Sequence, residues 1–419
     1  MNFAIDQTRL DREIDELAAF SADQAPSVTR VVFSEQDKQA RAWLKDRCRE
    51  AGLSIREDAV GNTFFRWAGT DPDLPAVCTG SHIDAIPHAG KYDGTVGVLG
   101  GLEAIRALQA SGFKPHRSIE LLLFTSEEPT RFGIGCLGSR VISGTLDTAA
   151  DNTLREFTAE EGGQPRTLVE VRTKAGYSGS LDSVRLPKNH YSAFIELHIE
   201  QGPILEKENI AAGLVTFIAA PAAFRIEIEG EGGHAGARLM PGRRDALCAA
   251  SEIILAIEHA ALSTGAIDTV GTVGICQVHP GAINSIPSRV QLSLDLRDTD
   301  AARRDIALDQ IRQACDQIAG KRKVGVKLEM INADEPAQSS PEIISALKAA
   351  CEAEGLSHRE MVSRAYHDSL FMARIAPVAM LFIPCRGGVS HRPDEYSSPG
   401  QIANGVKVLA RTLAALSAD

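Results

Sequence analysis

The chain has 419 residues, which is too long for one ordinary hydrophobic core, so we expect two domains. Hydrophobic residues make up 44% and charged residues 24% of the chain, the composition of a globular protein. The formal net charge of -11 excludes the basic surface of a general nucleic-acid binder, and no apolar run approaches the roughly 20 residues of a membrane span. We therefore expect neither nucleic-acid nor membrane partners.

The cysteines indicate a compartment. Eight of them are scattered singly, without a CxxC pair, which is typical of reduced and mostly buried thiols in a cytoplasmic protein. Residues 1–25 are acidic and lack the basic-then-apolar layout of a signal peptide. A nucleophilic thiol at Cys136 or Cys385 remains an alternative, although neither has an obvious histidine partner.

Helix and strand patterns alternate along the first part of the chain. The spacing predicts helices over residues 35–51 and 97–110. It predicts a strand over residues 61–67 and a short apolar run over 76–79. Buried strands are predicted over residues 118–125, 193–199 and, near the end of the chain, 378–383. Strands separated by helices predict an α/β fold, with a mostly parallel sheet covered by helices on both faces. The weakly periodic residues 147–189 are expected to form a long excursion over the surface or the site.

The pattern changes in the middle of the chain. Apolar and polar side chains alternate over residues 224–229 and 290–297, which predicts an antiparallel sheet with helices on one face only. Helical patterns cover residues 244–262 and 301–319. We therefore expect a smaller α+β, ferredoxin-like domain over residues 213–326, inserted into a larger α/β domain made of residues 1–212 and 327–419.

Four of the predicted strands end in acidic or histidine side chains. Ligands of open α/β sheets bind outside the carboxyl ends of the strands, so these side chains can converge in one crevice. A further polar cluster contains Asp93 and Gly94, and the glycine lets the backbone turn back toward the same crevice. The strand-end residues are His82 and Asp84, Glu127 and Glu128, His198 and Glu200, and His391.

The chemistry of these side chains suits divalent metal ions. Imidazole nitrogens and carboxylate oxygens bind Zn²⁺, Mn²⁺, Co²⁺ or Ni²⁺, and a pair of such ions makes a hydroxide near neutral pH and polarises a carbonyl. One carboxylate must reach both ions, and each ion needs further ligands. One glutamate must stay off the metals as a general base, so the adjacent Glu127 and Glu128 can divide metal binding and proton transfer between them. Any one of these residues alone is more often an ordinary hydrogen-bonded side chain, but their gathering at four strand ends favours a metal site.

Seven segments carry a resemblance to a known family. They are GSHIDAIPHAGKYDG, TSEEPTRFG, ELHIEQGPILE, GGHAGARLMPGRRDAL, NSIPSRVQLSLDLRD, AYHDSLFMA and GVSHRPDE. In order and over nearly the whole chain, they resemble the amidohydrolase branch of the dinuclear metallopeptidase clan. That branch includes N-carbamoyl-L-amino-acid amidohydrolase, β-ureidopropionase, allantoate amidohydrolase and ureidoglycolate amidohydrolase. The resemblance implies a catalytic domain, an inserted lid and dimerisation domain, and a homodimer.

The resemblance also implies two bound divalent ions, with Mn²⁺ favoured and Zn²⁺, Co²⁺ or Ni²⁺ possible. By motif, Asp93 would bridge the two ions. His82 and His198 would complete the ligands of one ion, and Glu128 and His391 those of the other.

Other roles follow from the same motifs. Asp84 would orient the imidazole of His82, Glu127 would be the general base, and His234 would reach the partner subunit's site to stabilise an oxyanion. The expected substrate-binding residues are Gln201, Asn284, Arg297 and His367. Arg297 would grip a carboxylate with its two-pronged guanidinium. Arg297 lies on the polar face of its predicted strand, so it could equally be an ordinary surface arginine. His234 lies between small residues and could equally be a turn residue.

Sequence variants bear on the substrate. The chain has SRAYHDS where carbamoylases usually have SGAGHDA, and ARLM instead of TTPM after its HAG motif, which looks most like ureidoglycolate amidohydrolase. Tyr366 would fill space that a glycine leaves open, which suits a small ureido-carboxylate substrate. The expected reaction is hydrolysis of a ureido C–N bond, from ureidoglycolate to glyoxylate, ammonia and carbon dioxide. The alternatives are an allantoate or N-carbamoyl-L-amino-acid amidohydrolase, a peptidase or aminoacylase, and a non-catalytic binding protein.

Overall fold

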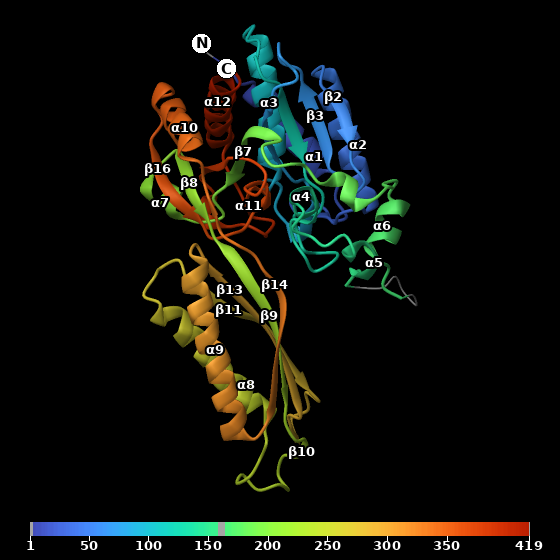
Figure 1. Cartoon of the computed structure of the whole chain (residues 1–419), viewed down its shortest axis with the longest axis vertical. Coiled ribbons are helices and arrows are strands. Elements are labelled where there is room, and N and C mark those ends of the chain that lie inside the picture. The colour runs from blue at the N-terminus through green and yellow to red at the C-terminus, as the bar shows by residue number, and fades with distance from the viewer. Residues whose placement is uncertain (1–2, 158–163, 419) are drawn as a thin grey trace. The chain divides into compact units, whose positions relative to one another are not determined.

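A computed structural model describes residues 3–157 and 164–418, which divide into two compact units (Figure 1). The first unit contains the described residues of Met1–Thr216, Gln338–Met361 and His367–Asp419. The second contains Phe217–Ala337 and Val362–Tyr366. This unit extends past the expected boundary at residue 326, because a strand over Gly325–Ala333 pairs with the strand over Ala220–Glu229.

The described residues of the first unit are built around a nine-stranded sheet. Its strands in spatial order are β15 (Ala337–Gln338), β8 (Ala212–Ile218), β17 (Val378–Ile383), β7 (Tyr191–Ile199), β4 (Ala76–Ser81), β6 (Ile119–Leu123), β3 (Thr63–Trp67) and β2 (Ser54–Glu57), with β16 (His358–Ser363) paired to β8. Strands β17, β7, β4 and β6 are mutually parallel, whereas β8, β3 and β2 pair antiparallel. The parallel arrangement expected from the sequence therefore describes the centre of the sheet.

Helices cover both faces of this sheet, as expected from strands that are apolar on both sides. Val77 and Ile195 belong to one hydrophobic core, and the adjacent Cys78 and Phe194 belong to the other. The helices are α1 (Gln7–Ala18), α2 (Glu35–Glu50), α3 (Thr95–Ala110), α4 (Leu137–Ser143), α5 (Ala150–Thr153), α6 (Leu168–Lys174), α7 (Ile204–Glu208), α10 (Pro341–Ala353), α11 (Asp368–Met372) and α12 (Pro399–Leu416), with short 3₁₀ turns η1 (Leu181–Val184) and η2 (Arg386–Gly388). A small ribbon, β1 (Val28–Arg30) with β5 (Ala85–Ala89), lies beside them.

Residues 147–189 were expected to form a long excursion over the surface or the site. The described residues of this segment form α5, α6 and η1, and Leu168, Val171, Leu181 and Val184 are buried in the second core of the first unit. The segment is therefore anchored to the fold. Residues 158–163, which belong to the same prediction, lie outside the described residues.

Helix α3 packs directly on the centre of the sheet. A side chain at Gly97 would place its Cβ 2.4 Å from the main-chain oxygen of Leu197 in β7, and one at Gly101 would meet Leu121 in β6 at 2.8 Å. Glycine is needed where a helix backbone approaches a strand this closely. The close packing fixes the first turn of α3, directly after Asp93, at the carboxyl ends of the central strands.

The second unit has an antiparallel four-stranded sheet among its described residues, with order β11-β13-β9-β14. Its elements are β9 (Ala220–Glu229), β10 (Gly233–His234), α8 (Ala246–Ser263), β11 (Val270–His279), β12 (Ser285–Ile286), β13 (Arg289–Asp298), α9 (Ala301–Arg322) and β14 (Gly325–Ala333). The main sheet and its helices follow a βαββαβ order, the expected ferredoxin-like topology. Among the described helices, α8 alone is long and apolar enough to cross a membrane, but Ile253 and Ile257 on it are buried in this unit's core.

Candidate metal centre and active site

The central parallel strands bring the predicted ligands together in the first unit. His82 follows β4, Glu127 and Glu128 lie just beyond β6, and His198 is near the end of β7. His391 follows β17 and the short turn η2. Because neighbouring parallel strands end at the same edge of a sheet, these side chains reach one crevice from four strands.

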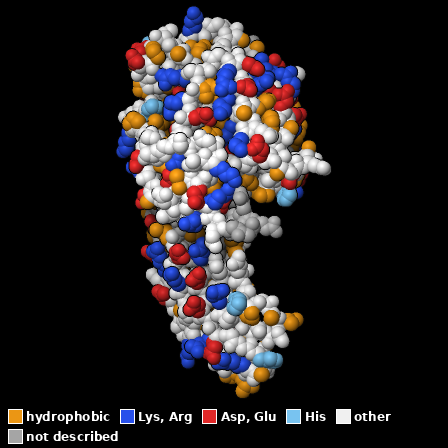
Figure 2. Space-filling view, turned by 90° about the vertical axis from the view of Figure 1, so that its right-hand side faces the viewer, with side chains coloured by type: hydrophobic (Ala, Val, Ile, Leu, Met, Phe, Trp, Pro, Cys, Tyr) orange, Lys and Arg blue, Asp and Glu red, His pale blue; other side chains and the backbone are white. Residues whose placement is uncertain are grey.

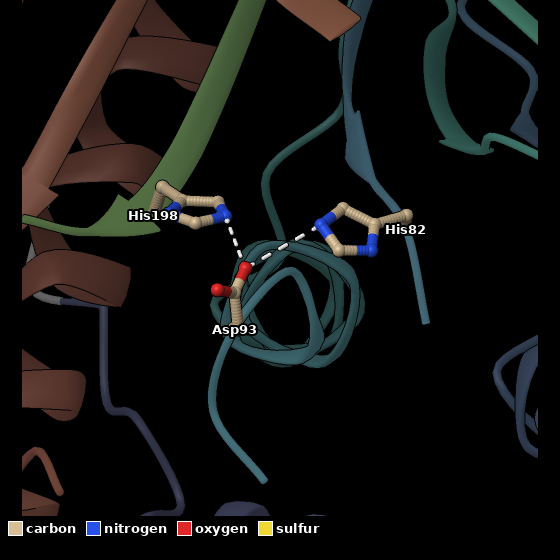
Figure 3. A group of neighbouring side chains, drawn as sticks. All are labelled: His82, Asp93 and His198. Atoms are coloured by element: carbon tan, nitrogen blue, oxygen red, sulfur yellow. Dashed lines mark ion pairs between the residues drawn. The ribbon is translucent and has the colours of Figure 1, made fainter. Parts of the chain in front are cut away.

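Asp93 lies between two histidines. Its Oδ1 atom is 3.5 Å from Nε2 of His82 and 3.2 Å from Nε2 of His198. Figure 3 shows the two imidazoles pointing at this one oxygen, His198 from its strand and His82 from the segment after β4. The three ligand atoms lie close enough to one another to hold a single cation.

The other oxygen of Asp93 faces a second group. Oδ2 is 3.4 Å from Nε2 of His391, and the same nitrogen is 3.3 Å from Oε1 of Glu128. These three residues form another candidate cation group among the described residues. Asp93 belongs to both groups and offers a different oxygen to each, which is the arrangement of a carboxylate that bridges two ions.

The histidines of the first group are oriented as ligands. Nδ1 of His82 lies 3.0 Å from the main-chain oxygen of Asp84, and Nδ1 of His198 lies 2.9 Å from that of Ile199. A carbonyl oxygen only accepts, so each Nδ1 carries a proton and Nε2 is the nitrogen left to face Asp93. The N–H of Gly94 also donates to Nε2 of His198, at 3.1 Å. An unprotonated Nε2 and a carboxylate oxygen 3.2 to 3.5 Å apart repel each other unless a proton or a cation lies between them. Imidazole nitrogen and carboxylate oxygen are ligands that divalent ions prefer, so the group fits such an ion.

The electrostatics of the cluster favour added positive charge. Hydrogen bonds to Asp93 and then to Glu128 raise the pKa of His391 to about 11. Burial disfavours the charged form of Asp93, but hydrogen bonds from His198, His391 and His82 hold its pKa well below the usual value. Protons on the imidazoles stabilise the cluster in the same way as a bound cation would.

Glu127 lies beside the ligands without joining either group. Its Oε2 atom is 3.7 Å from Nε2 of His82, and its main-chain N–H donates to Oδ1 of Asp84 at 3.2 Å. Burial raises the pKa of Glu127 well above its usual value, and the nearby carboxylate of Glu128 adds to the effect. A buried glutamate with a raised pKa beside candidate metal ligands is a candidate general base.

Asp84 positions this segment through its carboxylate. Oδ1 accepts from the N–H of Glu127 and Oδ2 accepts from the N–H of Glu128, the latter at 3.0 Å. Its side chain is 3.7 Å from Nδ1 of His82, farther than its main-chain oxygen. Asp84 was expected to orient His82, and in the structure its main-chain oxygen does so while its carboxylate holds the two glutamates.

Comparisons with known proteins place the chain in a family. The model of Peptidase family M20/M25/M40 matches residues 78–415, which include every predicted metal ligand. The chain belongs to this family. It is 54% identical to a ureidoglycolate hydrolase of Arabidopsis thaliana, over all of this chain and 88% of that protein. It is 37% identical to an N-carbamoyl-L-amino-acid amidohydrolase of Paenarthrobacter aurescens, over 97% of each chain.

Solved structures agree with this family membership. Crystal structures of AtUAH in complex with (S)-hydroxyglycine and with glyoxylate each match with a TM-score of 0.92 and 54% identity, covering 100% of this chain and 99% of theirs. The α/β fold expected from the sequence is confirmed at this level of similarity. The expected relation to the amidohydrolases is confirmed as well.

In this M20/M25/M40 family member, Gln201 contacts a ligand residue. Its Nε2 atom donates to Oδ2 of Asp93 at 2.6 Å, and Oγ of Ser390 is 2.8 Å from the same oxygen. Glu395 accepts from the N–H groups of Tyr92 and Asp93 at 2.9 and 3.1 Å. Gln201 was expected to be a substrate contact, and the contacts of Ser390 and Glu395 were not expected from the sequence. The SHRPDE segment was their only signal, because their contacts bridge parts of the chain far apart in sequence.

Backbone geometry at three positions brings side chains into the site. Ser126, Gln201 and His391 have φ angles of 58°, 56° and 58°, a left-handed conformation that residues other than glycine rarely adopt. Such positions cost about 1–3 kcal/mol each and persist where the surrounding contacts fix them. They lie just after β6, β7 and η2, in the segments that carry Glu127, Gln201 and His391 to the crevice.

His367 packs against the candidate ligand His198. Its ring is 4.5 Å from that of His198, centroid to centroid, and its side chain is buried. Glu196, His198 and His367 form a further candidate cation group among the described residues. However, both nitrogens of His198 are engaged, Nδ1 with Ile199 and Nε2 toward Asp93. We therefore assign no ion to this group, and the predicted substrate role of His367 stays a prediction.

Three predicted substrate or lid residues lie in the second unit. Nδ1 of His234 accepts from the N–H groups of Gly236 and Ala237, each at 3.1 Å, and its ring is exposed. Asn284 accepts from the N–H of Ala235 through its main-chain oxygen at 2.8 Å, so it lies beside His234. The structure brings these two together within the unit, and their catalytic roles stay predictions.

Arg297 is the third of these residues. Its Nε and Nη2 atoms donate to the two oxygens of Asp295 at 2.9 and 2.8 Å, and Nη1 donates to the main-chain oxygen of Arg364 at 3.1 Å. The ring of Tyr366 lies 5.4 Å from its guanidinium carbon. Arg297 is therefore a fixed cation next to Tyr366, and its grip on a carboxylate stays a prediction.

The two candidate nucleophilic cysteines, Cys136 and Cys385, are buried. All eight cysteines lie in the described part of the chain and are free thiols. Burial raises the pKa of Cys385 to about 12 and that of Cys136 well above its usual value. Since the thiolate is the nucleophilic form, the structure argues against a cysteine amidase.

Proposed function

We propose that this chain is an amidohydrolase that cleaves a ureido C–N bond of a small carboxylate, ureidoglycolate above all, to give glyoxylate, ammonia and carbon dioxide. The observation that carries the proposal is Asp93, which offers one oxygen to His82 and His198 and the other to His391 beside Glu128. The similarity over the full chain to the ureidoglycolate hydrolase of Arabidopsis thaliana supports the choice of substrate.

The proposal includes two divalent ions, Mn²⁺ in the first place. His82, Asp93 and His198 would hold one, and Asp93, Glu128 and His391 the other. Ions held there supply Lewis acidity, which acidifies water and polarises a carbonyl. Zn²⁺, Co²⁺ and Ni²⁺ have the same preference for imidazole and carboxylate ligands, so each of them is an alternative to Mn²⁺.

The chain's own residues perform the proton transfers. Oε2 of Glu127 takes the proton from the attacking water and returns it to the leaving nitrogen, so that ammonia departs in place of the amide anion. The raised pKa of Glu127, due first to burial, suits it to both steps. Arg297 holds the substrate carboxylate and His234 donates to the oxyanion, while Gln201, Asn284 and His367 position the ureido group.

We also propose a homodimer in the cytoplasm. Exposed apolar side chains gather on the tip loops of the second unit, where Leu239 is 79% and Met240 71% exposed and Ile283 is fully exposed (Figure 2). Such a patch is typical of a protein interface. It flanks His234 and Asn284, which supports the idea that these residues serve the partner's site. The free thiols support a reducing compartment.

A substrate panel tests the proposal. Purified protein reconstituted with Mn²⁺ is assayed for ammonia release from ureidoglycolate, allantoate and N-carbamoyl-L-amino acids. We expect the highest kcat/KM for ureidoglycolate. A higher kcat/KM for either rival would overturn the proposed substrate and leave the amidohydrolase chemistry, whereas binding without ammonia release at every metal loading would show a non-catalytic protein.

A further inference from the structure

The carboxylate of Glu127 has a different neighbour at each oxygen. Oε2 is 3.7 Å from Nε2 of His82, on the side of the candidate ligands. Oε1 is 3.5 Å from Sγ of Cys136, which donates to it. The thiol and the carboxylate are both buried. The ligand cluster and the proposed reaction leave the thiol without a role.

The main chain fixes this thiol next to the glutamate. The N–H of Cys136 donates to the main-chain oxygen of Glu127 at 2.7 Å, and the next two N–H groups, of Leu137 and Gly138, donate to Ser126 and Thr125 at 2.8 Å. Three successive hydrogen bonds thus bind residues 136–138 to the segment that carries the glutamate. Cys136 itself has a left-handed backbone, with φ 55°, as it begins α4. The position of Sγ is therefore set by the fold.

The thiol is in the form that can donate. Burial raises the pKa of Cys136 well above its usual value, and the negative charges of Glu127 and Asp368 raise it further. A protonated thiol is a weak hydrogen-bond donor and the carboxylate oxygen is an acceptor. The contact therefore occupies one oxygen of the glutamate while adding no charge.

We propose that Cys136 is a positioning residue for Glu127. Its thiol holds Oε1, and because the two carboxylate oxygens are rigidly linked, it turns Oε2 toward the ligands and the attacking water. This inference deepens the proposed function, on which its kinetic test rests. A second, spectroscopic test does not depend on any activity.

The kinetic test uses Cys136→Ala and Cys136→Ser. Loss of one hydrogen bond to a carboxylate is expected to lower kcat about five- to tenfold with KM and metal content unchanged in the alanine variant, and the serine variant, which keeps a donor, should retain more kcat than alanine. Cys48→Ala is the matched control, since it removes a buried sulfur of α2 away from the site and should leave kcat unchanged. Wild-type kcat in Cys136→Ala, or serine no better than alanine, would overturn the proposal.

The spectroscopic test measures the S–H stretching band of Cys136 by infrared spectroscopy. The band is isolated as the difference between the wild type and Cys136→Ala. In Glu127→Gln it should move to higher frequency, because a neutral amide oxygen is a weaker acceptor than a carboxylate. An unchanged band would contradict the hydrogen bond. If the wild type hydrolyses no ureido acid, the proposed function fails, while this measurement still decides whether the thiol of Cys136 holds Glu127.

Discussion

Asp93 connects the two halves of the candidate metal centre, and several groups fix its carboxylate. Gln201 and Ser390 contact Oδ2, at 2.6 and 2.8 Å, and Glu395 holds the main-chain N–H of Asp93. A carboxylate held by this many partners cannot rotate away from either group of ligands. Its preorganisation would lower the cost of binding the two proposed ions.

At the residue scale, Glu127→Gln separates proton transfer from metal binding. The amide has the same shape but cannot act as a base, so kcat is expected to fall about 10²- to 10⁴-fold. Metal content, measured by elemental analysis, should equal that of the wild type, because Glu127 belongs to neither ligand group among the described residues. A variant with wild-type kcat would show that another residue is the base, and loss of metal would show that Glu127 is a ligand.

Among the helices and strands, α3 holds the preceding residue Asp93 at the site through its tight packing on β7. Gly97→Ala would place a methyl group 2.4 Å from the main-chain oxygen of Leu197. We expect the free energy of unfolding in urea to fall by about 1–3 kcal/mol and the metal affinity to fall with it.

The matched control for this variant is Gly400→Ala in α12. A Cβ at Gly400 meets no atom within 4 Å, so this exposed substitution is expected to leave stability unchanged or raise it by up to about 1 kcal/mol. Equal stability of the two variants would contradict the role assigned to the close contact between α3 and β7.

The sequence predicted the elements that bring ligands together. His82, Glu127, Glu128 and His198 follow or end hydrophobic runs, and such runs form neighbouring parallel strands whose carboxyl ends meet. Of the outer, antiparallel strands, β3 was predicted as a strand over residues 61–67, but its direction was not, because an apolar run gives no sign of strand direction.

Contacts made through irregular backbone could not be predicted from the sequence. Ser390 reaches Asp93 from beside the left-handed His391, and the thiol of Cys136 reaches Glu127 because Ser126 and Cys136 are left-handed too. Periodicity carries no information about such turns. The strand over 325–333 was also missed, since its side chains are mostly exposed at the edge of its sheet.

At the scale of the whole molecule, the proposed homodimer places His234 of one subunit at the site of the other. Co-expression of Glu127→Gln with His234→Ala tests this directly. In a mixed dimer, one site combines an intact Glu127 with the partner's intact histidine, so random pairing should restore about a quarter of the wild-type activity. Each variant alone should be nearly inactive. If mixing restores no activity, each subunit completes its own site and the shared-site proposal is wrong.

The positions at which divalent ions bind test the proposed metal centre most directly. A crystal of the protein grown with Mn²⁺ is measured at the manganese absorption edge, so that anomalous peaks locate the ions. We predict two peaks on either side of Asp93, one between its Oδ1 atom, His82 and His198, and the other between its Oδ2 atom, Glu128 and His391. A single peak that leaves one of these groups empty, or no peak at Asp93, would contradict the two-ion centre.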